Sequence, residues 1–333
     1  MNQTMDNNLI SSAEIKPLRA EDLKAVIAID TETSGISRRG YFEKRLKAAT
    51  EHPRDYVYVG LHSGGELAGF AFAKLVEGEF GQPGASASLD AIGVAPGAQG
   101  IGVGRRLLEA VEGILVHKGV ERVTTQVEWA DRALLHFLGD AGFALDTRMV
   151  LARSTDNLTE DYMDPAEGNA LEIDHSSPNA DDFVALSRDK VPVRSMTAED
   201  LKSIVTIDER VSGRNRSAYY ARKQHEVLHE SGVRVSLVAE LEGYPVGYAM
   251  ARMDFGEFGR ASEEAVMDTI GVDPGYQGRG VGQALISQLM ANLSALQVKT
   301  LRTEIEWNDV DFITFFSAMG FVPTQRVTLC RKL

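Results

Sequence analysis

Two glycine-rich runs are the segments of this chain whose residue types and spacing could do chemistry. The first is Gln99-Gly100-Ile101-Gly102-Val103-Gly104, and the second is Gln277-Gly278-Arg279-Gly280-Val281-Gly282. Each run follows an apolar β-type stretch and precedes an apolar stretch with helical spacing. A glycine loop at a helix start leaves backbone N–H groups unpaired at the positive end of the helix dipole. We therefore predict that each run can hold a pyrophosphate.

Two well-known phosphate loops do not match these runs. Neither run continues into Gly-Lys-Ser or Gly-Lys-Thr, which excludes a Walker A loop, and the G-x-G-x-x-G spacing of dinucleotide-binding folds is absent. A single Gly-x-Gly is weak evidence, because glycines also serve turns and helix caps. The position between a strand and a helix, and the repetition of the run, make this signal stronger.

The two runs lie 178 residues apart in the sequence, and the same offset of 178 relates residues far outside them. The matched pairs are Asp22/Asp200, Asp30/Asp208, Gly35/Gly213, Asp90/Asp268, Pro96/Pro274, Trp129/Trp307 and Gly142-Phe143/Gly320-Phe321. Chance similarity does not keep register over so long a stretch, and the period is far too long for a solenoid repeat. The chain therefore contains two tandem copies of one globular domain.

Composition predicts where the two copies begin and end. We expect a flexible tail over 1–14, a first domain over 15–155, an acidic linker over 156–190 and a second domain over 191–333. Each copy reads as a strand, two helices, three β-runs, the glycine loop, a helix, a strand, a helix and a last strand. This order predicts an α/β fold with a mixed, mostly antiparallel sheet and helices on both faces. Gly64-Gly65 and Glu242-Gly243 are the expected hairpin turns.

Bulk composition narrows the functional class. The 333 residues carry a net charge of −13, which argues against a nucleic-acid partner. The single cysteine, Cys330, excludes a disulfide framework within one chain, and we expect no metal site. The polar N-terminus does not read as a signal peptide, and no stretch approaches about 20 apolar residues. We expect a cytoplasmic protein without a membrane partner, either a monomer that is an internal pseudo-dimer or a homodimer.

The pattern Gln-x-x-Gly-x-Gly after a strand ending in Val-x-Pro resembles motif A of the GCN5-related N-acetyltransferase (GNAT) family. Ala141-Gly142-Phe143 and Met319-Gly320-Phe321 resemble the end of that family's domain. The resemblance covers both halves and implies acetyl-CoA as co-substrate, with the two glycine runs around its pyrophosphate. It also implies that backbone groups near four strand residues bind the pantetheine arm and polarise the thioester: Ile92, Val94, Ile270 and Val272.

The resemblance implies direct attack of a primary amine on acetyl-CoA in a ternary complex. Positioning of the two reactants and stabilisation of the developing oxyanion then contribute most to the rate. An amine with a pKa of about 10.4 is protonated at pH 7, so a base or a water relay is expected. Glu304 matches the position where some family members keep a catalytic Glu, whereas its first-half match, Gln126, cannot take a proton. The candidate bases are Asp90, Glu128, Asp268, Glu304 and Glu306, and each also fits a structural role.

Other residues fall where the family binds its acceptor. Arg38, Tyr41, Arg216 and Tyr219 match the acceptor loop and are predicted to bind substrate, with surface packing as the alternative. Glu79 and Glu257, in a repeated Gly-Glu-Phe-Gly turn, either line the acceptor site or only shape the turn. Trp129 and Trp307 are predicted to belong to the core.

Two departures from the family pattern keep a second function open. Leu138 and Phe316 stand where many family members place a Tyr that protonates the leaving thiolate, and Ile101 replaces the basic Arg279. Because the C-terminal half keeps more of the pattern, we expect it to be the better catalyst. The missing Tyr supports the alternative of a non-catalytic acyl-CoA-binding or regulatory protein.

Overall fold

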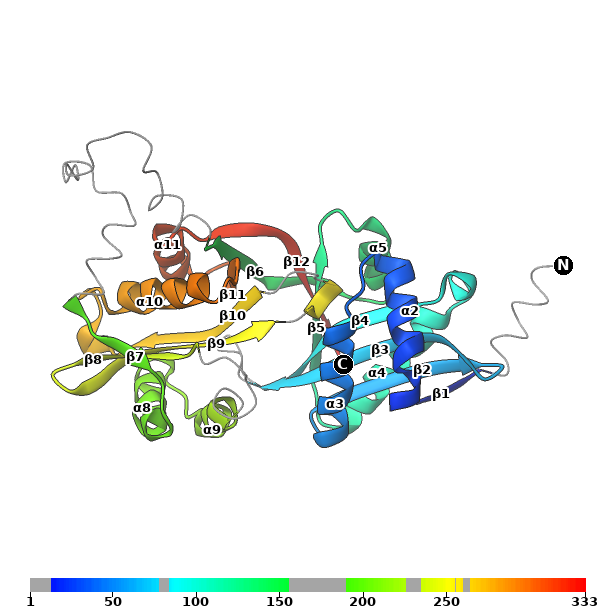
Figure 1. Cartoon of the computed structure of the whole chain (residues 1–333), viewed down its shortest axis with the longest axis horizontal. Coiled ribbons are helices and arrows are strands. Elements are labelled where there is room, and N and C mark those ends of the chain that lie inside the picture. The colour runs from blue at the N-terminus through cyan, green and yellow to red at the C-terminus, as the bar shows by residue number, and fades with distance from the viewer. Residues whose placement is uncertain (1–12, 78–83, 156–189, 226–234, 255, 260–263) are drawn as a thin grey trace.

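A computed structural model of the chain describes residues 13–77, 84–155, 190–225, 235–254, 256–259 and 264–333. Figure 1 shows two halves side by side, joined through one sheet. The predicted tail and the predicted linker lie outside the described residues, except at residues 13, 14 and 190. Glu79 also lies outside them.

The N-terminal half follows the predicted order of elements, and the C-terminal half repeats it. The elements of the first are β1 (Glu14–Pro17), α2 (Leu23–Ser34), α3 (Arg39–Glu51), β2 (Tyr56–Ser63), β3 (Glu66–Glu77), β4 (Ala85–Val94), α4 (Val103–His117), β5 (Arg122–Glu128), α5 (Arg132–Asp140) and β6 (Ala144–Ser154). Those of the second are β7 (Val193–Ser195), α8 (Leu201–Ser212), α9 (Ser217–His225), β8 (Leu237–Leu241), β9 (Tyr244–Asp254), β10 (Glu264–Val272), α10 (Val281–Ala295), β11 (Thr300–Glu306), α11 (Val310–Ala318) and β12 (Val322–Lys332).

Local signals in the sequence set several of these boundaries. Asp131 caps α5 by accepting a hydrogen bond from the backbone of Leu134 at 3.0 Å, and Asp309 does the same for α11. The hairpin between β2 and β3 turns at Gly64 (φ 61°) and Gly65 (φ 89°), as predicted. Positive φ at both turn residues matches the twist of the flanking strands.

The twelve strands in the described part of the chain form one sheet, in the order β1-β2-β3-β4-β5-β12-β6-β11-β10-β9-β8-β7. Adjacent strands are antiparallel except for β4 with β5 and β10 with β11. The order is unchanged when the two halves are exchanged, which indicates an approximate two-fold axis between β6 and β12. The predicted mixed, mostly antiparallel α/β fold is confirmed.

The last strand of each half is exchanged with the other half. β12 hydrogen-bonds to β5 of the first half, and β6 hydrogen-bonds to β11 of the second. Figure 1 shows β12 running from the second half across to β5. Met149 and Leu151 of β6 are buried in the core of the second half, whereas Leu329 of β12 belongs to the core of the first. Part of the core of each half is therefore formed by residues from the other half.

Helices cover both faces of the sheet in each half. Alternate residues of β2 face opposite ways: Val57 and Val59 pack with α4, whereas Tyr58 packs with α2 and α3. In the second half, Leu237 packs with α10, whereas the next residue, Val238, packs with α8 and α9 on the opposite face. The glycine loops lie where β4 meets α4 and where β10 meets α10.

The two tryptophans correct a prediction. Trp129 is 64% exposed and Trp307 is 59% exposed, so neither belongs to the core. The reason is that β5 ends at Glu128 and β11 ends at Glu306, which places each tryptophan in the turn that follows rather than on the inner strand face. Cys330 lies in β12, the last strand.

Candidate active site

Both glycine loops form a concave backbone at the start of a helix. Gly102 (φ 93°) precedes α4 and Gly280 (φ 81°) precedes α10, and both backbones lie in the left-handed region that favours glycine. The first intrahelical bond runs from Arg106 N to Gly102 O, so the N–H groups before Arg106 have no helical partner. A Cβ added at Gly100 or Gly102 would meet no atom within 4 Å. The space above the loop is open, which fits a phosphate group.

The glutamine that opens each loop fixes the loop to its strand. The side-chain amide of Gln99 donates to the Val94 carbonyl at 3.1 Å, and that of Gln277 donates to the Val272 carbonyl at 3.3 Å. Ile101 does not line the pocket beside its loop. Arg279 lies over the Tyr276 ring, 5.1 Å from its centroid.

The sheet opens beside each loop because two parallel strands diverge. β4 pairs with β5 only at residues 86–88, although β4 continues to Val94. β10 pairs with β11 only at Ala265 and Val266 and continues to Val272. Backbone groups of the unpaired strand ends can therefore hydrogen-bond a ligand that enters the opening.

In the N-terminal half the opening forms a cavity of about 840 Å³, which we call the N pocket. It extends from the glycine loop to Asp90, Gln126 and Glu128, and it is also lined by Ile92, Val94, Asp30 and Arg38. Phe258, Gly259 and Arg326 reach it from the C-terminal half or its exchanged strand. One continuous cavity thus joins the glycine loop to carboxylates and to the predicted acceptor loop.

The corresponding cavity of the C-terminal half, the C pocket, has a volume of about 620 Å³. Its lining includes the Gln277–Gly282 loop, Ile270, Val272, Phe312 and Phe315. As the described residues form it, the candidate bases Asp268, Glu304 and Glu306 do not line it. The two glycine loops therefore lead to pockets of different depth and polarity.

A hydrogen-bonded tyrosine pair in the C-terminal half occupies the positions that two phenylalanines occupy in the N-terminal half. The Tyr220 hydroxyl donates to Asp208 at 2.9 Å, and the Tyr220 and Tyr248 oxygens are 2.7 Å apart. Burial raises the pKa of Tyr220 and raises that of Tyr248 to about 12, so both keep their protons at neutral pH. In the N-terminal half the matched residues are Phe42 and Phe70, and there Asp30 and Arg38 line the N pocket.

The two matched aspartates lie at strand irregularities and have different partners. Asp90 interrupts the register between β3 and β4, and it is 5% exposed. Ser88 donates to Asp90 at 2.7 Å, and the nearest Arg45 nitrogen lies 3.7 Å away. Burial raises the pKa of the Asp90 carboxyl, with Arg45 opposing that effect. Asp268, in contrast, is held by the Lys223 ammonium at 2.7 Å.

Glu304 lies near the two-fold axis. The amide of Gln126, its match 178 residues earlier, donates to one Glu304 oxygen, and Arg148 lies 2.9 Å from the other. Both oxygens are thus engaged in contacts between the halves. Glu128 is half-exposed and pairs with Arg326 at 2.7 Å, and Glu306 lies opposite Arg148 in the strand register.

The predicted acceptor-loop residues separate into two groups. Arg38 pairs with Asp30, donates to the Gly256 carbonyl at 2.7 Å and lines the N pocket. Arg216 pairs with Asp208 instead and does not line the C pocket. Tyr41 and Tyr219 are buried beneath these arginines, with the guanidinium carbon 5.3 Å from each ring centroid. These two tyrosines pack in the core rather than face a pocket.

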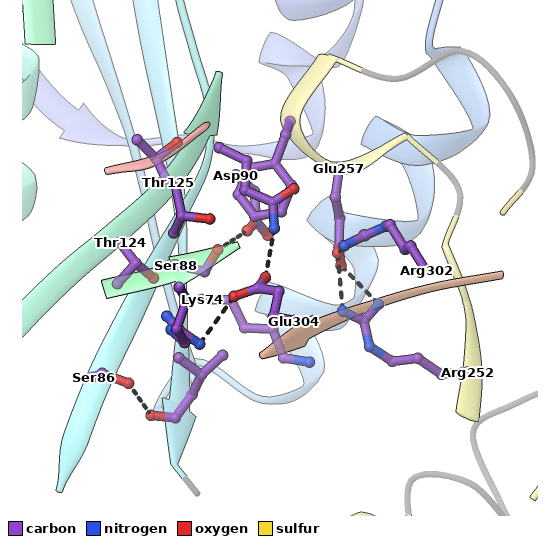
Figure 2. Close-up of a pocket in the computed structure, with 15 residues that line it drawn as sticks. Lys74, Ser86, Ser88, Asp90, Thr124, Thr125, Arg252, Glu257, Arg302 and Glu304 are labelled. Carbon is purple, nitrogen blue, oxygen red and sulfur yellow. Dashed lines mark hydrogen bonds and ion pairs between the residues drawn. The ribbon is translucent and has the colours of Figure 1, made fainter. Parts of the chain in front are cut away.

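A third cavity lies between the halves, and we call it the junction chamber. Its volume is about 40 Å³, and its lining comes from both halves: Lys74, Val76, Ser86, Ser88, Asp90, Thr124, Thr125, Gln126, Arg148, Arg252, Glu257, Phe258, Arg302, Glu304 and Thr328. Figure 2 shows Arg252 and Arg302 converging on Glu257, across the chamber from Ser88 and Asp90. Sequence reasoning missed Lys74, Arg148, Arg252 and Arg302, because no local motif marks residues that meet only across the axis.

The buried Lys223–Asp268 pair should be important for stability. Lys223 is 2% exposed, and removal of one partner from a buried ion pair costs about 3 to 5 kcal/mol. We expect Lys223→Met to lower the free energy of unfolding in urea by that amount. The surface pair Lys47–Glu51 provides the control, since Lys47→Met should cost less than about 1 kcal/mol. Equal effects of the two substitutions would contradict the buried pairing.

Within the described ranges, no group of three or more His, Cys, Asp or Glu is placed to hold a metal ion. No described helix is both long and apolar enough to cross a bilayer.

Comparison with known proteins identifies one family in both halves of the chain. The model of the acetyltransferase (GNAT) family matches twice, at residues 23–143 and 199–321. The [ribosomal protein bS18]-alanine N-acetyltransferase of Escherichia coli (strain K12) is 36% identical over 59 residues, which are 18% of this chain and 40% of that protein.

Two solved structures share the fold over 96% of this chain. The tandem GNAT protein from the clavulanic acid biosynthesis pathway is 17% identical, has a TM-score of 0.60, and is covered over 98% of its length. The fungal multi-domain GH3 beta-N-acetylglucosaminidase, with its GCN5-related glucosamine N-acetyltransferase region, is 16% identical, has a TM-score of 0.66, and is covered over 38%. At these identities the likeness concerns the fold alone.

Proposed function

We propose that this chain, which belongs to the acetyltransferase (GNAT) family, transfers an acetyl group from acetyl-CoA to a primary amine. We further propose that the N-terminal half carries the reaction. The observation behind this choice is the N pocket, which joins a glycine loop, diverging strands and a buried carboxylate in one cavity. The sequence pattern favours the C-terminal half, but there the candidate bases lie outside the pocket.

The N pocket fits acetyl-CoA in its chemistry. The N–H groups at the start of α4 have no helical partner, and the space beside Gly100 and Gly102 is open, so a pyrophosphate could be bound there. The β4 backbone from Ile92 to Val94 lines the opening and would hydrogen-bond the pantetheine arm. Acetyl-CoA would supply an acetyl thioester, whose carbonyl carbon gains a bond to nitrogen as its bond to sulfur breaks.

Asp90 is the group best placed to accept the proton of the acceptor amine. It lines both the N pocket and the junction chamber, and burial raises its pKa toward the working range of a general base. Glu304 is less suited, because Gln126 and Arg148 engage its two oxygens. The proton lost by the ammonium would pass to the Asp90 carboxylate, leaving a neutral nitrogen that can attack.

Asp90→Asn tests this role. We expect kcat/KM to fall by about 10² or more, with little change in acetyl-CoA affinity. As the pH falls through the raised pKa of Asp90, the carboxylate is protonated and the wild-type rate drops, so the acidic limb should lie above the ordinary Asp value of about 3.9. The limb should be absent in Asp90→Asn. If Glu128→Gln removes the limb instead, the role belongs to Glu128.

The C-terminal half is proposed to bind acetyl-CoA without turning it over. Its glycine loop has the same backbone form, with Gly278 (φ 73°) and Gly280 (φ 81°) in the left-handed region. Its pocket, however, lacks the strand carboxylates that the N pocket contains, as far as the described residues line it. The non-catalytic alternative for the protein thus becomes a proposal for one half.

A further inference from the structure

The turn over residues 256–259, which we call the junction turn, belongs to the C-terminal half in sequence but lies against the N-terminal half. Its helical part, Glu257–Gly259, contacts β4 and β5. Figure 1 shows it as a short yellow helix near β5. Phe258 and Gly259 line the N pocket. The C-terminal half therefore supplies part of the wall of the N-terminal site.

Phe258 has an unusual backbone that its surroundings hold in place. Its φ of 54° lies in the left-handed region, which is rare for an aromatic residue and occurs most often at ligand sites. Arg326 of the exchanged strand β12 donates to the Phe258 carbonyl at 2.9 Å. Arg38, which caps α3, donates to the Gly256 carbonyl at 2.7 Å. The backbone on both sides of the Phe258 ring is thus fixed against the N-terminal half.

The Glu257 side chain anchors the junction turn between the halves. The residue is 3% exposed, and its carboxylate pairs with Arg45 of α3. Arg252 of β9 donates to both of its oxygens at 3.0 Å, as Figure 2 shows. Because a buried carboxylate is costly without such partners, the turn keeps one position relative to β4 and β5.

Phe258 is the aromatic side chain at the Asp90 end of the N pocket. Phe137, the other aromatic residue in the described lining, lies beside the glycine loop, where a Cβ added at Gly104 would be 3.2 Å from its ring. Phe258 and Asp90 instead line the N pocket and the junction chamber together. An acceptor whose amino group lies near Asp90 would therefore have Phe258 beside the rest of its body.

The charged side chains at this end of the pocket are paired with one another. Arg38 donates to the Asp30 carboxylate at 3.1 Å, and Arg326 lies 2.7 Å from a Glu128 oxygen. Such pairs have little net charge with which to attract a charged group on the body of an acceptor. An apolar body, in contrast, leaves water and gains contact area when it packs on the Phe258 ring.

We propose that Phe258 is a specificity-determining residue of the N-terminal site, supplied by the C-terminal half, and that it selects a primary amine with an aromatic body. The inference rests on the proposed acetyl transfer in the N-terminal half. It concerns the part of the acceptor beyond the amino group. The acceptor ring packs against Phe258, and the pair of rings gains an attraction that depends on their geometry in addition to the buried area.

The test compares two acceptors that share an aminoethyl stem, ethylamine and 2-phenylethylamine, with the full chain. In the wild type, we expect kcat/KM for 2-phenylethylamine to exceed that for ethylamine by about tenfold or more. Phe258→Ala should lower this ratio about tenfold, mainly by raising the KM for 2-phenylethylamine, and leave the KM for acetyl-CoA unchanged. The control is Tyr244→Ala at the start of β9, because Tyr244 is 70% exposed and lines neither pocket. It should not change the ratio.

Equal kcat/KM values for the two amines in the wild type would overturn the proposal. An unchanged ratio in Phe258→Ala, including an equal loss for both amines, would do the same, because it would assign the ring a structural role alone.

A second measurement does not depend on turnover or on the folding of a variant. Wild-type crystals soaked with CoA and 2-phenylethylamine should show the phenyl ring within about 4 Å of the Phe258 side chain. A ring bound elsewhere, or no bound ring, would contradict the inference. If neither amine is acetylated but the phenyl ring contacts Phe258, the proposed acetyl transfer fails and the role of Phe258 in binding stands.

Discussion

Gly102→Asp is expected to abolish acetyl transfer, while Gly280→Asp leaves most of it in place. An aspartate at Gly102 would put a negative charge beside the proposed pyrophosphate site at the start of α4. Two like charges about 4 Å apart at an effective dielectric constant of 20 repel by about 4 kcal/mol, or about a thousandfold in affinity. CoA release with a primary amine measures turnover, and calorimetry counts the bound acetyl-CoA.

Calorimetry distinguishes the loss of one acetyl-CoA site in each variant from a general loss of folding. The wild type should bind two acetyl-CoA molecules per chain and each variant one. Gly102→Ala is the control for backbone strain, because it keeps the positive φ but adds no charge, at a cost of about 1 to 2 kcal/mol. If Gly280→Asp abolishes turnover and Gly102→Asp does not, the C-terminal half is the catalyst.

Separation of the two halves should have the second large effect. A fragment over 13–155 lacks β12, which leaves the edge of β5 unpaired and the core without Leu329. A fragment over 190–333 lacks β6 and with it the contacts of Met149 and Leu151. Loss of one such buried leucine or methionine side chain alone costs about 2 to 5 kcal/mol. We therefore expect neither fragment to be a stable monomer.

Size-exclusion chromatography with light scattering would measure the state of each fragment. Mixing or coexpressing the two should give a one-to-one complex with restored CoA release, because β6 and β12 can then pair as they do in the chain. Two monomeric fragments, each with a cooperative thermal transition and acetyl-CoA binding of its own, would show that the exchanged strands are dispensable.

Local signals in the sequence are sufficient for the fold of each half. The alternation of Val57, Tyr58 and Val59 predicts a strand with two buried faces, and Gly102 before an apolar helical stretch predicts the loop that the structure shows. The constant offset reveals the duplication. Each of these signals lies within about 20 residues, or depends on simple comparison of the two copies.

The strand exchange and the chamber could not be predicted in this way. The residue patterns of β6 and β12 would be the same if each strand paired within its own half. Nothing in these residues therefore specifies which half the strand pairs with. The sequence pattern places Trp129 on the face of a strand, but that strand, β5, ends one residue earlier, at Glu128. The predicted ranking of the two halves depends on Glu304 and Arg279, whereas in the structure Asp90 lines the pocket beside its glycine loop and its match Asp268 does not.

The Gln126–Glu304 contact has a consequence for how the duplicated chain evolved. Residues matched by duplication start out identical, so the first fused chain had the same residue at both of these positions near the axis. Two buried glutamates at that distance would repel, and one would have to bind a proton. A glutamine facing a glutamate donates to it instead. Once that difference was established, the copies became complementary, and neither could replace the other without loss.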